Sequence, residues 1–358
     1  MPEHPKMKLA VIVSQLSVGG AERFVSELVN YLDDLGVEIH LILLFKYPRF
    51  YDLNKGVKIY EPEFLLKSTT KVIYFFKIRH FLRFRVKTIK PDSIINIGYV
   101  SLVVFCLLGV KFPLYISNRS NPLKRRPLWY KIIRRFMYSY ATGIIAQTSV
   151  AKEYYTTTTW NKNIAIIPNF VREITPNSET TRHNYIVSVG RFISTKNFDG
   201  LIRIFSRVNN KSWKLILLGD GALRNKLESI ATEYNIADRV IFTGFQKDVD
   251  FWLQQSKIFV FTSLSEGFPN ALLEAMATPL PVISYDCPVG PSDIVINEVN
   301  GFLIPMGDED LYIEKLQKLI DDEQLRLSMQ KNAIKVREVY SKDKIIRRLL
   351  NFVTEPNK

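Results

Sequence analysis

Cysteine and histidine are scarce in this chain of 358 residues, which contains two cysteines and four histidines. Cys106 and Cys287 lie far apart in the sequence without the spacing of a metal site, and no histidine clusters with another candidate ligand. Isolated cysteines of this kind are typical of free thiols in a reducing compartment. The sequence therefore predicts a cytoplasmic protein without a dedicated zinc site, and no metal or other cofactor is expected.

A long hydrophobic run is also missing. The longest apolar stretch, from Val100 to Val110, has roughly half the length that a membrane-spanning helix requires, so it predicts a buried helix. Residues Met1 to Lys8 lack the basic and apolar order of a signal peptide, and Lys8–Val13 predicts a first strand. We therefore expect a protein that is soluble or peripherally bound to a membrane.

Acidic residues are depleted in the first half of the chain. Residues 1–170 contain 25 lysines and arginines against 11 aspartates and glutamates, whereas residues 171–358 contain 24 of each class. The whole formal net charge of +14 therefore belongs to the first half. Such an asymmetry predicts an anionic surface as the partner of that half.

Two basic segments in the first half, 67–90 and 124–135, contain interleaved aromatic residues and no acid. Residues 68–70 predict a helix cap, and Pro91 predicts that this helix ends before it. A basic helix with aromatic side chains suits an anionic membrane surface, which we expect as the partner. A nucleic acid would select the same composition but is not expected here. A solvated helix with a buried aromatic face is the structural alternative.

Apolar strands alternate with helical stretches in both halves, which predicts parallel sheets covered by helices on both faces. We expect an α/β fold of two doubly wound, Rossmann-like domains at 1–172 and 173–340. A polar linker is expected at 173–184, and the last helix, in 341–358, is expected to pack back on the first domain. The expected strands are Lys8–Val13, Glu38–Leu44, Ser93–Ile97, Leu114–Ser117, Gly143–Ala146, Tyr185–Val189, Lys214–Leu218, Val240–Thr243, Ile258–Thr262 and Val282–Ser284.

Two glutamates, Glu266 and Glu274, flank a helix start predicted near Pro269, because proline suits the first helical position. The unpaired N–H groups and the positive dipole end of such a helix favour an anion. A carboxylate on each side would then bind hydroxyl groups at both ends of a phosphate, which matches the shape of a nucleotide-sugar. Two unrelated acids at a solvated helix start are the alternative.

Three glycine-containing loops follow predicted strands, where open α/β sheets bind their ligands. The loop Gly190-Arg191, with Lys196, offers two cations to phosphate oxygens. The loop Gly219-Asp220-Gly221 permits a tight turn, with Asp220 either at a ligand or capping a helix. The segment Gly19-Gly20-Ala21-Glu22-Arg23 opens the first helix and can face a phosphate or an acceptor. It has neither the dinucleotide fingerprint nor the P-loop sequence.

Two Asp-x-Asp strings occur, at Asp248/Asp250 and at Asp308/Asp310. Acidic pairs hold a metal ion in some sugar transferases. Here both strings look like the first turn of a helix, where an acid is favoured by the helix dipole. We therefore interpret them as helix starts and not as metal ligands.

Taken together, these motifs resemble the family 4 glycosyltransferases over nearly the whole chain. The resemblance implies the GT-B fold, in which two Rossmann-like domains face each other across a cleft. It also implies a metal-independent transfer with retention of configuration. It rests on Gly-Gly-Ala-Glu-Arg at 19–23, Pro168-Asn169, Gly190-Arg191 with Lys196, Gly219-Asp220-Gly221, Glu-x7-Glu at 266–274, Gly290-Pro291 and Asn300-Gly301-Phe302.

The resemblance also implies a role for individual residues. Arg191 and Lys196 would bind the donor diphosphate, Glu274 the ribose hydroxyls and Glu266 the hydroxyls of the donor sugar. Of these, Glu266, Arg191 and Lys196 would be the catalytic residues. The other donor-binding positions would be Gly19, Gly20, Gly190, Asp220, Gly244, Phe245, Phe268 and Pro269.

Arg119 is a departure from the family pattern. Some members carry a histidine in the loop after a middle strand of the first domain, where this chain has Arg119. An arginine stays charged at neutral pH and cannot act as a general base, but it could bind a phosphate of donor or acceptor. Glu22 and Arg23 would complete the acceptor side. A front-face mechanism, in which the leaving phosphate oxygen takes the acceptor proton, needs no such base.

The function that the resemblance implies is that of a hexosyltransferase. It would move a hexose or N-acetylhexosamine from a UDP-sugar to a polyprenyl-diphosphate-linked glycan on the inner face of the cell membrane, in surface polysaccharide, O-antigen or glycan assembly. A soluble family 4 transferase with a small sugar or sugar-phosphate acceptor is the alternative within the enzyme class. A non-catalytic protein that holds nucleic acid or acidic lipid is the alternative outside it.

Overall fold

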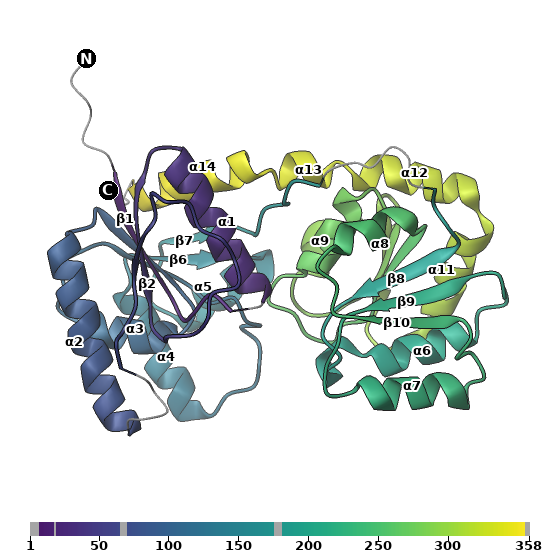
Figure 1. Cartoon of the computed structure of the whole chain (residues 1–358), viewed down its shortest axis with the longest axis horizontal. Helices are drawn as coiled ribbons and strands as arrows, with labels where there is room; N and C mark the ends of the chain where they lie inside the picture. The colour runs from purple at the N-terminus through teal and green to yellow at the C-terminus, as the bar shows by residue number, and fades with distance from the viewer. Residues whose placement is uncertain (1–6, 18, 65–69, 175–180, 355–358) are drawn as a thin grey trace, which may run out of the picture. The chain divides into compact units, whose positions relative to one another are not determined.

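The structure, a computed structural model, describes residues 7–17, 19–64, 70–174 and 181–354, and it divides into two compact units (Figure 1). The first unit comprises the chain up to Asn169 together with the residues from Asp343 onward. The second unit comprises Phe170–Lys342. Half of the polar linker expected from the sequence, residues 175–180, lies outside the described residues.

The first unit is built on a sheet of seven strands, all parallel, in the order β3-β2-β1-β4-β5-β6-β7. Five of them lie where the sequence predicts strands, because strands covered on both faces read as continuous apolar runs. The two edge strands, β3 and β7, were missed, since each contains only three residues. The strands are β1 (Lys8–Val13), β2 (Glu38–Leu43), β3 (Lys58–Tyr60), β4 (Ser93–Ile97), β5 (Leu114–Ser117), β6 (Gly143–Ala146) and β7 (Ile164–Ile166).

Helices connect these strands and cover the sheet. Thr70 caps α2 by accepting a hydrogen bond from the Ile73 N–H, and α2 ends at Ile89, before Pro91, as predicted. The C-terminal helix α14 packs on this unit, where Ser93 Oγ donates to the Val353 carbonyl over 2.7 Å. The helices are α1 (Gly20–Asp34), α2 (Lys71–Ile89), α3 (Val100–Leu107), α4 (Leu128–Tyr140), α5 (Ser149–Thr158) and α14 (Lys342–Thr354).

The second unit is built on a six-stranded parallel sheet in the order β10-β9-β8-β11-β12-β13. The sequence predicts five of these strands and misses β13. The chain runs outward from β8 in one direction and then from β11 in the other, so the strand order reverses between β8 and β11. The strands are β8 (Tyr185–Val189), β9 (Lys214–Leu218), β10 (Val240–Gly244), β11 (Ile258–Phe261), β12 (Val282–Asp286) and β13 (Gly301–Pro305).

Helices lie on both faces of the second sheet, with α6 and α7 on one side of β8, β9 and β10 and with α8 and α9 on the other (Figure 1). Open sheets of this kind bind ligands beside the carboxyl ends of the strands, where the strand order reverses. The helices are α6 (Phe198–Ser206), α7 (Arg224–Glu233), α8 (Val249–Gln255), α9 (Asn270–Ala277), α10 (Pro291–Ile294), α11 (Glu309–Asp321), α12 (Glu323–Ala333) and α13 (Val336–Val339).

The helix starts agree with the sequence interpretation, with one correction. Asp248 caps α8 by accepting from the Phe251 N–H, and Asp308 caps α11 by accepting from the Leu311 N–H, which confirms the helix-start interpretation of both Asp-x-Asp strings. Pro269 was expected at the first helical position, but it is the N-cap of α9, and Asn270 is the first helical residue. The reason is that the backbone of Pro269 adopts a non-helical ψ of 72°.

Candidate active site

The loops that leave β8, β9 and β10 are fastened to one another at the carboxyl edge of the second sheet. The Gly190 N–H donates to the Leu218 carbonyl over 2.9 Å, and the Gly219 N–H donates to the Gly244 carbonyl over 3.0 Å. Gly219 has a φ of +140°, and a Cβ atom there would lie 1.9 Å from the carbonyl oxygen of Gly190. Glycine is therefore required for the close approach of the first two loops.

Lys196 and Glu266 meet at this edge, although 70 residues separate them in sequence. Lys196 ends the short 3-10 helix Ser194–Lys196 after β8, and its Nζ donates to Glu266 Oε1 over 2.6 Å. The Leu264 N–H donates to the Thr195 carbonyl over 2.8 Å, which ties the loop after β11 to the loop after β8. The exposed fractions of the Lys196 and Glu266 side chains are 20% and 10%, so the pair is mostly withdrawn from water. Two of the predicted catalytic residues thus lie together.

Arg191 lies in the same loop after β8, but it is exposed, and no hydrogen bond or ion pair joins it to Lys196 or Glu266. The loop conformation explains this difference. The next residue, Phe192, is buried in the core between β8 and α6, so Arg191 points the opposite way, toward solvent. A long cation on the rim of a site can reach a ligand's phosphate without being held in advance.

Helix α9 begins at Asn270, a few residues after Glu266 in the sequence. Pro269 supplies no side-chain cap to this helix, and the Asn270 N–H donates to the Phe268 carbonyl, so it is the positive dipole end that suits an anion here. Gly290, with a φ of +105°, approaches so closely that a Cβ atom would lie 2.4 Å from Pro269 Cδ. The predicted donor-binding residue Phe268 is buried in the core of the unit, so only its backbone is placed to contact a ligand.

Glu274 lies in the second turn of α9 and is buried, and the residue that faces it was not predicted. Arg172 Nε lies 3.7 Å from Glu274 Oε2, and the two terminal nitrogens of Arg172 donate to both carboxylate oxygens of Asp250. From the sequence, Asp250 is interpreted as part of a helix start and not as a metal ligand, so its contact with Arg172 is not predicted. The one available signal was that Arg172 follows Pro168-Asn169 by three residues.

Asp220 and Phe245 lie at the rim of the same edge. Asp220 Oδ1 accepts from the Gly221 N–H over 2.7 Å, and Asp220 Oδ2 lies 3.3 Å from Arg224 Nη1. The side chain is therefore engaged within the turn and with Arg224, but it does not cap α7, whose N-cap is Leu223 without a side-chain cap. Gly244 has a φ of +71°, and the adjacent Phe245 side chain is 57% exposed on the loop after β10. Phe245 thus offers a flat apolar surface beside the strand ends.

In the first unit, the glycine-rich segment forms the N-terminus of α1. Gly19 is the N-cap, and its N–H and carbonyl group both contact the Tyr51 hydroxyl, at 3.3 and 3.0 Å. A Cβ atom on Gly19 would lie 2.2 Å from Glu22 Oε2, so the Glu22 carboxylate folds back over the helix start. Arg23 forms an i,i+4 ion pair with Glu27 at 3.9 Å.

Arg119 is held in a polar cluster at the carboxyl edge of the first sheet. It follows β5, donates to the amide oxygen of Asn169 and stacks over the Phe24 ring at 4.1 Å. Gln147 also donates to the Asn169 amide oxygen, over 2.9 Å. Burial lowers the pKa of Arg119 to about 9, so the side chain remains a cation at neutral pH. Its Nε is buried and has no hydrogen-bond partner among the described residues.

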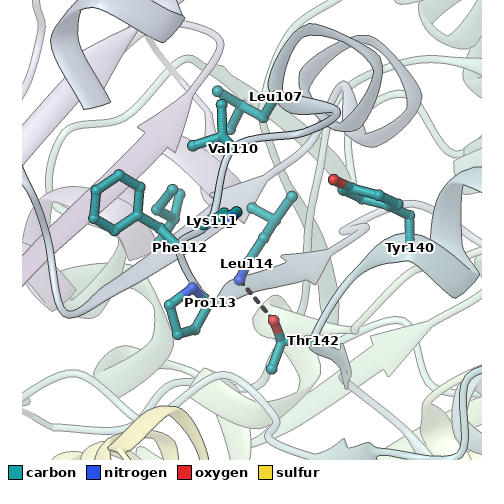
Figure 2. Close-up of a pocket in the computed structure, with 9 residues that line it drawn as sticks. Leu107, Val110, Lys111, Phe112, Pro113, Leu114, Tyr140 and Thr142 are labelled. Atoms are coloured by element: carbon teal, nitrogen blue, oxygen red, sulfur yellow. Dashed lines mark hydrogen bonds between the residues drawn. The ribbon is translucent and has the colours of Figure 1, made fainter. Parts of the chain in front are cut away.

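A separate surface pocket lies at the opposite, amino end of β4 and β5 (Figure 2). Its walls are polar and apolar in about equal measure, with Lys111 and Tyr140 among the lining residues. Thr142 Oγ1 accepts a hydrogen bond from the Leu114 N–H over 2.9 Å. None of the predicted site residues lines it. The predicted site residues lie instead at the carboxyl edge of each sheet, each edge within its own unit.

The outer surface of the first unit carries an unusual number of exposed apolar side chains. In α4 only Arg134 and Tyr138 are buried, whereas Trp129 is 62% and Phe136 is 52% exposed, which contradicts the alternative of a buried aromatic face for this helix. Lys124, Arg125 and Arg126 precede α4 and are exposed. In α2 the exposed apolar residues are Val72, Ile73, Phe76 and Phe84. Lys67, at the start of the first basic segment, lies outside the described residues.

Two kinds of feature are absent from the parts of the chain that the structure describes. No helix there combines the length and the apolar character needed to cross a membrane. Nor do three or more His, Cys, Asp or Glu side chains come together there as a group able to hold a metal ion. Both cysteines are buried free thiols.

Two family models match consecutive parts of the chain. Residues 18–173 match the model described as Glycosyltransferase Family 4, and residues 171–336 match the model described as Glycosyl transferases group 1. The two matches meet where the two structural units meet, so each model corresponds to one unit. Together they contain every residue that the sequence singles out as a candidate for the site.

Curated relatives and a solved structure are similar to nearly the whole chain. The amylovoran biosynthesis glycosyltransferase AmsD of Erwinia amylovora is 27% identical over 332 residues, which cover 89% of this chain and 92% of the relative. The GalNAc-alpha-(1->4)-GalNAc-alpha-(1->3)-diNAcBac-PP-undecaprenol alpha-1,4-N-acetyl-D-galactosaminyltransferase of Campylobacter jejuni is 27% identical over 335 residues, with 91% and 92% coverage. Alr3699/HepE of Anabaena, solved with UDP and glucose, has a TM-score of 0.79 at 16% identity and covers 96% of this chain and 98% of its own. This last likeness shows the GT-B fold.

Proposed function

The chain belongs to glycosyltransferase family 4, and from this premise we propose that it moves a hexose or N-acetylhexosamine from a UDP-sugar to a polyprenyl-diphosphate-linked glycan. The transfer retains the anomeric configuration and needs no metal ion. The observation that carries the proposal is the Lys196–Glu266 pair at the carboxyl edge of the second sheet, one loop away from the start of α9 and from Glu274. A cation, a helix start and two carboxylates are the groups that a nucleotide-sugar needs.

The chemistry of the second unit follows from where charge develops. Breaking the bond between sugar and phosphate places negative charge on the departing diphosphate and positive charge on the sugar ring. Lys196, the rim cation Arg191 and the N-terminus of α9 stabilise the diphosphate, and preorganised groups of this kind supply much of an enzyme's rate enhancement. The Glu266 carboxylate, already oriented by Lys196, accepts hydrogen bonds from hydroxyl groups of the donor sugar. Phe245 offers its ring to the base, and Glu274 binds the ribose.

Arg119 is assigned to the acceptor side. A buried guanidinium that keeps its charge and has an unused N–H is suited to a phosphate oxygen. Because an arginine cannot accept the proton of the acceptor hydroxyl at neutral pH, that proton goes to the leaving phosphate oxygen in a front-face reaction. Glu22 and Arg23, at the start of α1, are assigned to the same side.

The acceptor is membrane-held because the first unit is suited to an anionic lipid surface. Asp92 is the only acid between Phe64 and Lys152. Within this stretch α4 exposes Trp129 and Phe136 next to cationic side chains, a combination typical of helices that lie in a membrane interface. The name of the Campylobacter relative specifies an undecaprenol diphosphate acceptor, which agrees with this assignment. Surface polysaccharide assembly on the inner face of the cell membrane would provide such a substrate.

The experiment measures UDP release by the purified protein. It is supplied with UDP-hexoses and UDP-N-acetylhexosamines and with liposomes that contain a polyprenyl-diphosphate-linked glycan. We expect release only when donor and acceptor are both present, an unchanged rate in EDTA, and an α-linked product from an α-linked donor. A product of inverted configuration would contradict the retaining mechanism, and a rate abolished by EDTA would contradict metal independence.

A soluble transferase that acts on a small sugar or sugar phosphate is the second candidate. The same assay separates the two candidates if the lipid-linked acceptor is replaced by free sugars and sugar phosphates. Equal rates with a free acceptor and with the lipid-linked acceptor in liposomes would favour the soluble enzyme.

A further inference from the structure

Of the two aspartates in the Asp248/Asp250 string, Asp250 is the one that does not cap the helix. Asp248 provides the cap of α8, whereas the Asp250 carboxylate accepts hydrogen bonds from both terminal nitrogens of Arg172. Such a forked pair fixes the plane as well as the position of the guanidinium. Asp250 therefore determines where the third nitrogen of Arg172, Nε, is directed.

That third nitrogen faces the site. Arg172 Nε lies 3.7 Å from Glu274 Oε2, beyond a short hydrogen bond but within an ion pair. The exposed fractions of the side chains are 20% for Arg172, 18% for Asp250 and 10% for Glu274, so the attraction is screened less than at an open surface. One cation between two carboxylates leaves the group with a formal net negative charge, so Arg172 does not cancel the charge of both acids.

Three separate elements hold this arrangement. Asp250 belongs to α8 and Glu274 to α9, while Arg172 lies in the segment by which the chain enters the second unit. The backbone of that segment is itself anchored, because the Val171 N–H donates to the Tyr340 carbonyl over 2.8 Å. The guanidinium therefore cannot follow Glu274 if the carboxylate turns, and it acts as a fixed support.

We propose that Arg172 is a positioning residue that orients the Glu274 carboxylate toward the two ribose hydroxyls of the nucleotide, and that Asp250 orients Arg172. This inference rests on the proposed function and deepens it, because it identifies what makes the site specific for a ribonucleotide. A carboxylate that is oriented in advance accepts both hydroxyls without losing side-chain freedom. A site built to hydrogen-bond a hydroxyl rejects the analogue that lacks it.

The test compares the binding of UDP and 2′-deoxy-UDP by calorimetry, with no sugar and no acceptor present. We expect the wild-type protein to bind UDP roughly tenfold or more tightly than 2′-deoxy-UDP, because hydrogen bonds to a charged group are among the stronger ones. Arg172→Lys keeps the charge but cannot contact both carboxylates, and it should reduce this preference to about twofold. Asp250→Asn should reduce it in the same direction through Arg172, which provides a second variant if Arg172→Lys does not fold.

A matched control is available in the same unit. Arg203 forms a forked ion pair with Glu309, outside the proposed site, so Arg203→Lys makes the same chemical change there. It should leave the UDP preference unchanged. A folded Arg172→Lys variant with the full wild-type preference, or one that loses affinity for both nucleotides equally, would overturn the inference.

Failure of the proposed function would look different. A Glu274→Gln variant that keeps the full preference for UDP would show that Glu274 does not bind the ribose, and the positioning role would be overturned together with that assignment. The same holds if the wild-type protein binds neither nucleotide. Unchanged preference in Arg172→Lys, combined with lost preference in Glu274→Gln, would overturn the role of Arg172 alone.

Discussion

The two units share one architecture but differ in charge balance, because the whole formal excess of positive charge belongs to the first half of the chain. In the second unit, carboxylates hold several cations: Lys196 contacts Glu266, Arg172 contacts Asp250 and Glu274, and Arg203, outside the site, contacts Glu309. Cations lie over aromatic rings in both units, as Lys196 does over Phe261 at 5.5 Å, but fewer acids accompany them in the first unit. The guanidinium carbons of Arg85, Arg134 and Arg135 lie 5.0 Å from Tyr60, 4.6 Å from Tyr154 and 4.6 Å from Trp160.

This difference determines what each surface can bind. A carboxylate cancels the charge of its partner, whereas an aromatic ring attracts a cation without neutralising it. The first unit therefore keeps a strong positive field next to exposed apolar side chains, and the second holds a balanced, oriented site. Two sheets of the same topology can thus serve an extended anionic surface and a single small ligand, because side chains and not topology determine the surface.

Removing the Lys196 cation of the second unit should have the largest effect, which is on the rate of transfer. Lys196→Ala deletes a group that stabilises the departing diphosphate, and we expect the rate of transfer to fall about 10²- to 10³-fold. The rate is measured as UDP release at saturating donor. The thermal midpoint is measured in parallel, because the substitution also leaves Glu266 without its lysine. The exposed Lys214, at the amino end of β9, gives the control Lys214→Ala, and an equal loss in the control would contradict the prediction.

Removing three positive charges from the first unit should have the next largest effect, which is a weaker binding to membranes. Replacing Lys124, Arg125 and Arg126 by glutamine removes three charges, each worth about 1 kcal/mol near an anionic bilayer, so binding should weaken roughly 10²-fold. Co-sedimentation with vesicles containing phosphatidylglycerol measures it. Three exposed lysines of the second unit, changed to glutamine in the same way, are the control: Lys211, Lys226 and Lys318. Equal weakening in both variants would show that total charge matters and not its location.

The backbone at the edge of the second sheet can be tested at one glycine. Gly219→Ala forces a Cβ atom to within 1.9 Å of the Gly190 carbonyl at a φ of +140°, so we expect a loss of stability of about 2–5 kcal/mol. Gly36 of the first unit has a φ of +85° with nothing within 4 Å of a Cβ atom, so Gly36→Ala should cost only about 1–2 kcal/mol. Denaturant unfolding measures both, and equal losses would contradict the clash.

The smallest effect concerns a place where the first unit resembles the second. Glu38 pairs with Lys58 at 2.6 Å, and the hydrogen bond from Lys58 lowers the Glu38 pKa to about 2. A carboxyl with a lowered folded-state pKa stabilises the protein above its unfolded value of 4.5, and this contribution is lost as the pH falls toward 2. Lys58→Met should lower the thermal midpoint slightly at pH 7 and not at pH 2, whereas the control Lys55→Met should do neither. A midpoint difference that does not depend on pH would contradict the pKa as its cause.

Much of the fold and part of the site could be predicted from the sequence. Strands buried on both faces, such as β4 and β8, are continuous apolar runs, and the caps at Thr70, Asp248 and Asp308 are local signals. The short edge strands β3 and β7 were missed because three residues carry no periodicity. Arg172 was missed because its place three residues after Pro168-Asn169 does not by itself distinguish it from a solvated arginine. Its partners Asp250 and Glu274 are 78 and 102 positions away.

The sequence by itself determined the two-unit α/β organisation, the excess of positive charge in the first half and the residue types available at the strand ends. These properties depend on composition and on contacts between near neighbours in the chain. Only the tertiary structure decided that Lys196 meets Glu266, that Arg191 faces solvent and that Arg172 connects Asp250 to Glu274. Such pairings depend on which strand ends the order of strands in the sheet brings together. They also depend on the direction of a side chain, which a buried neighbour such as Phe192 can fix.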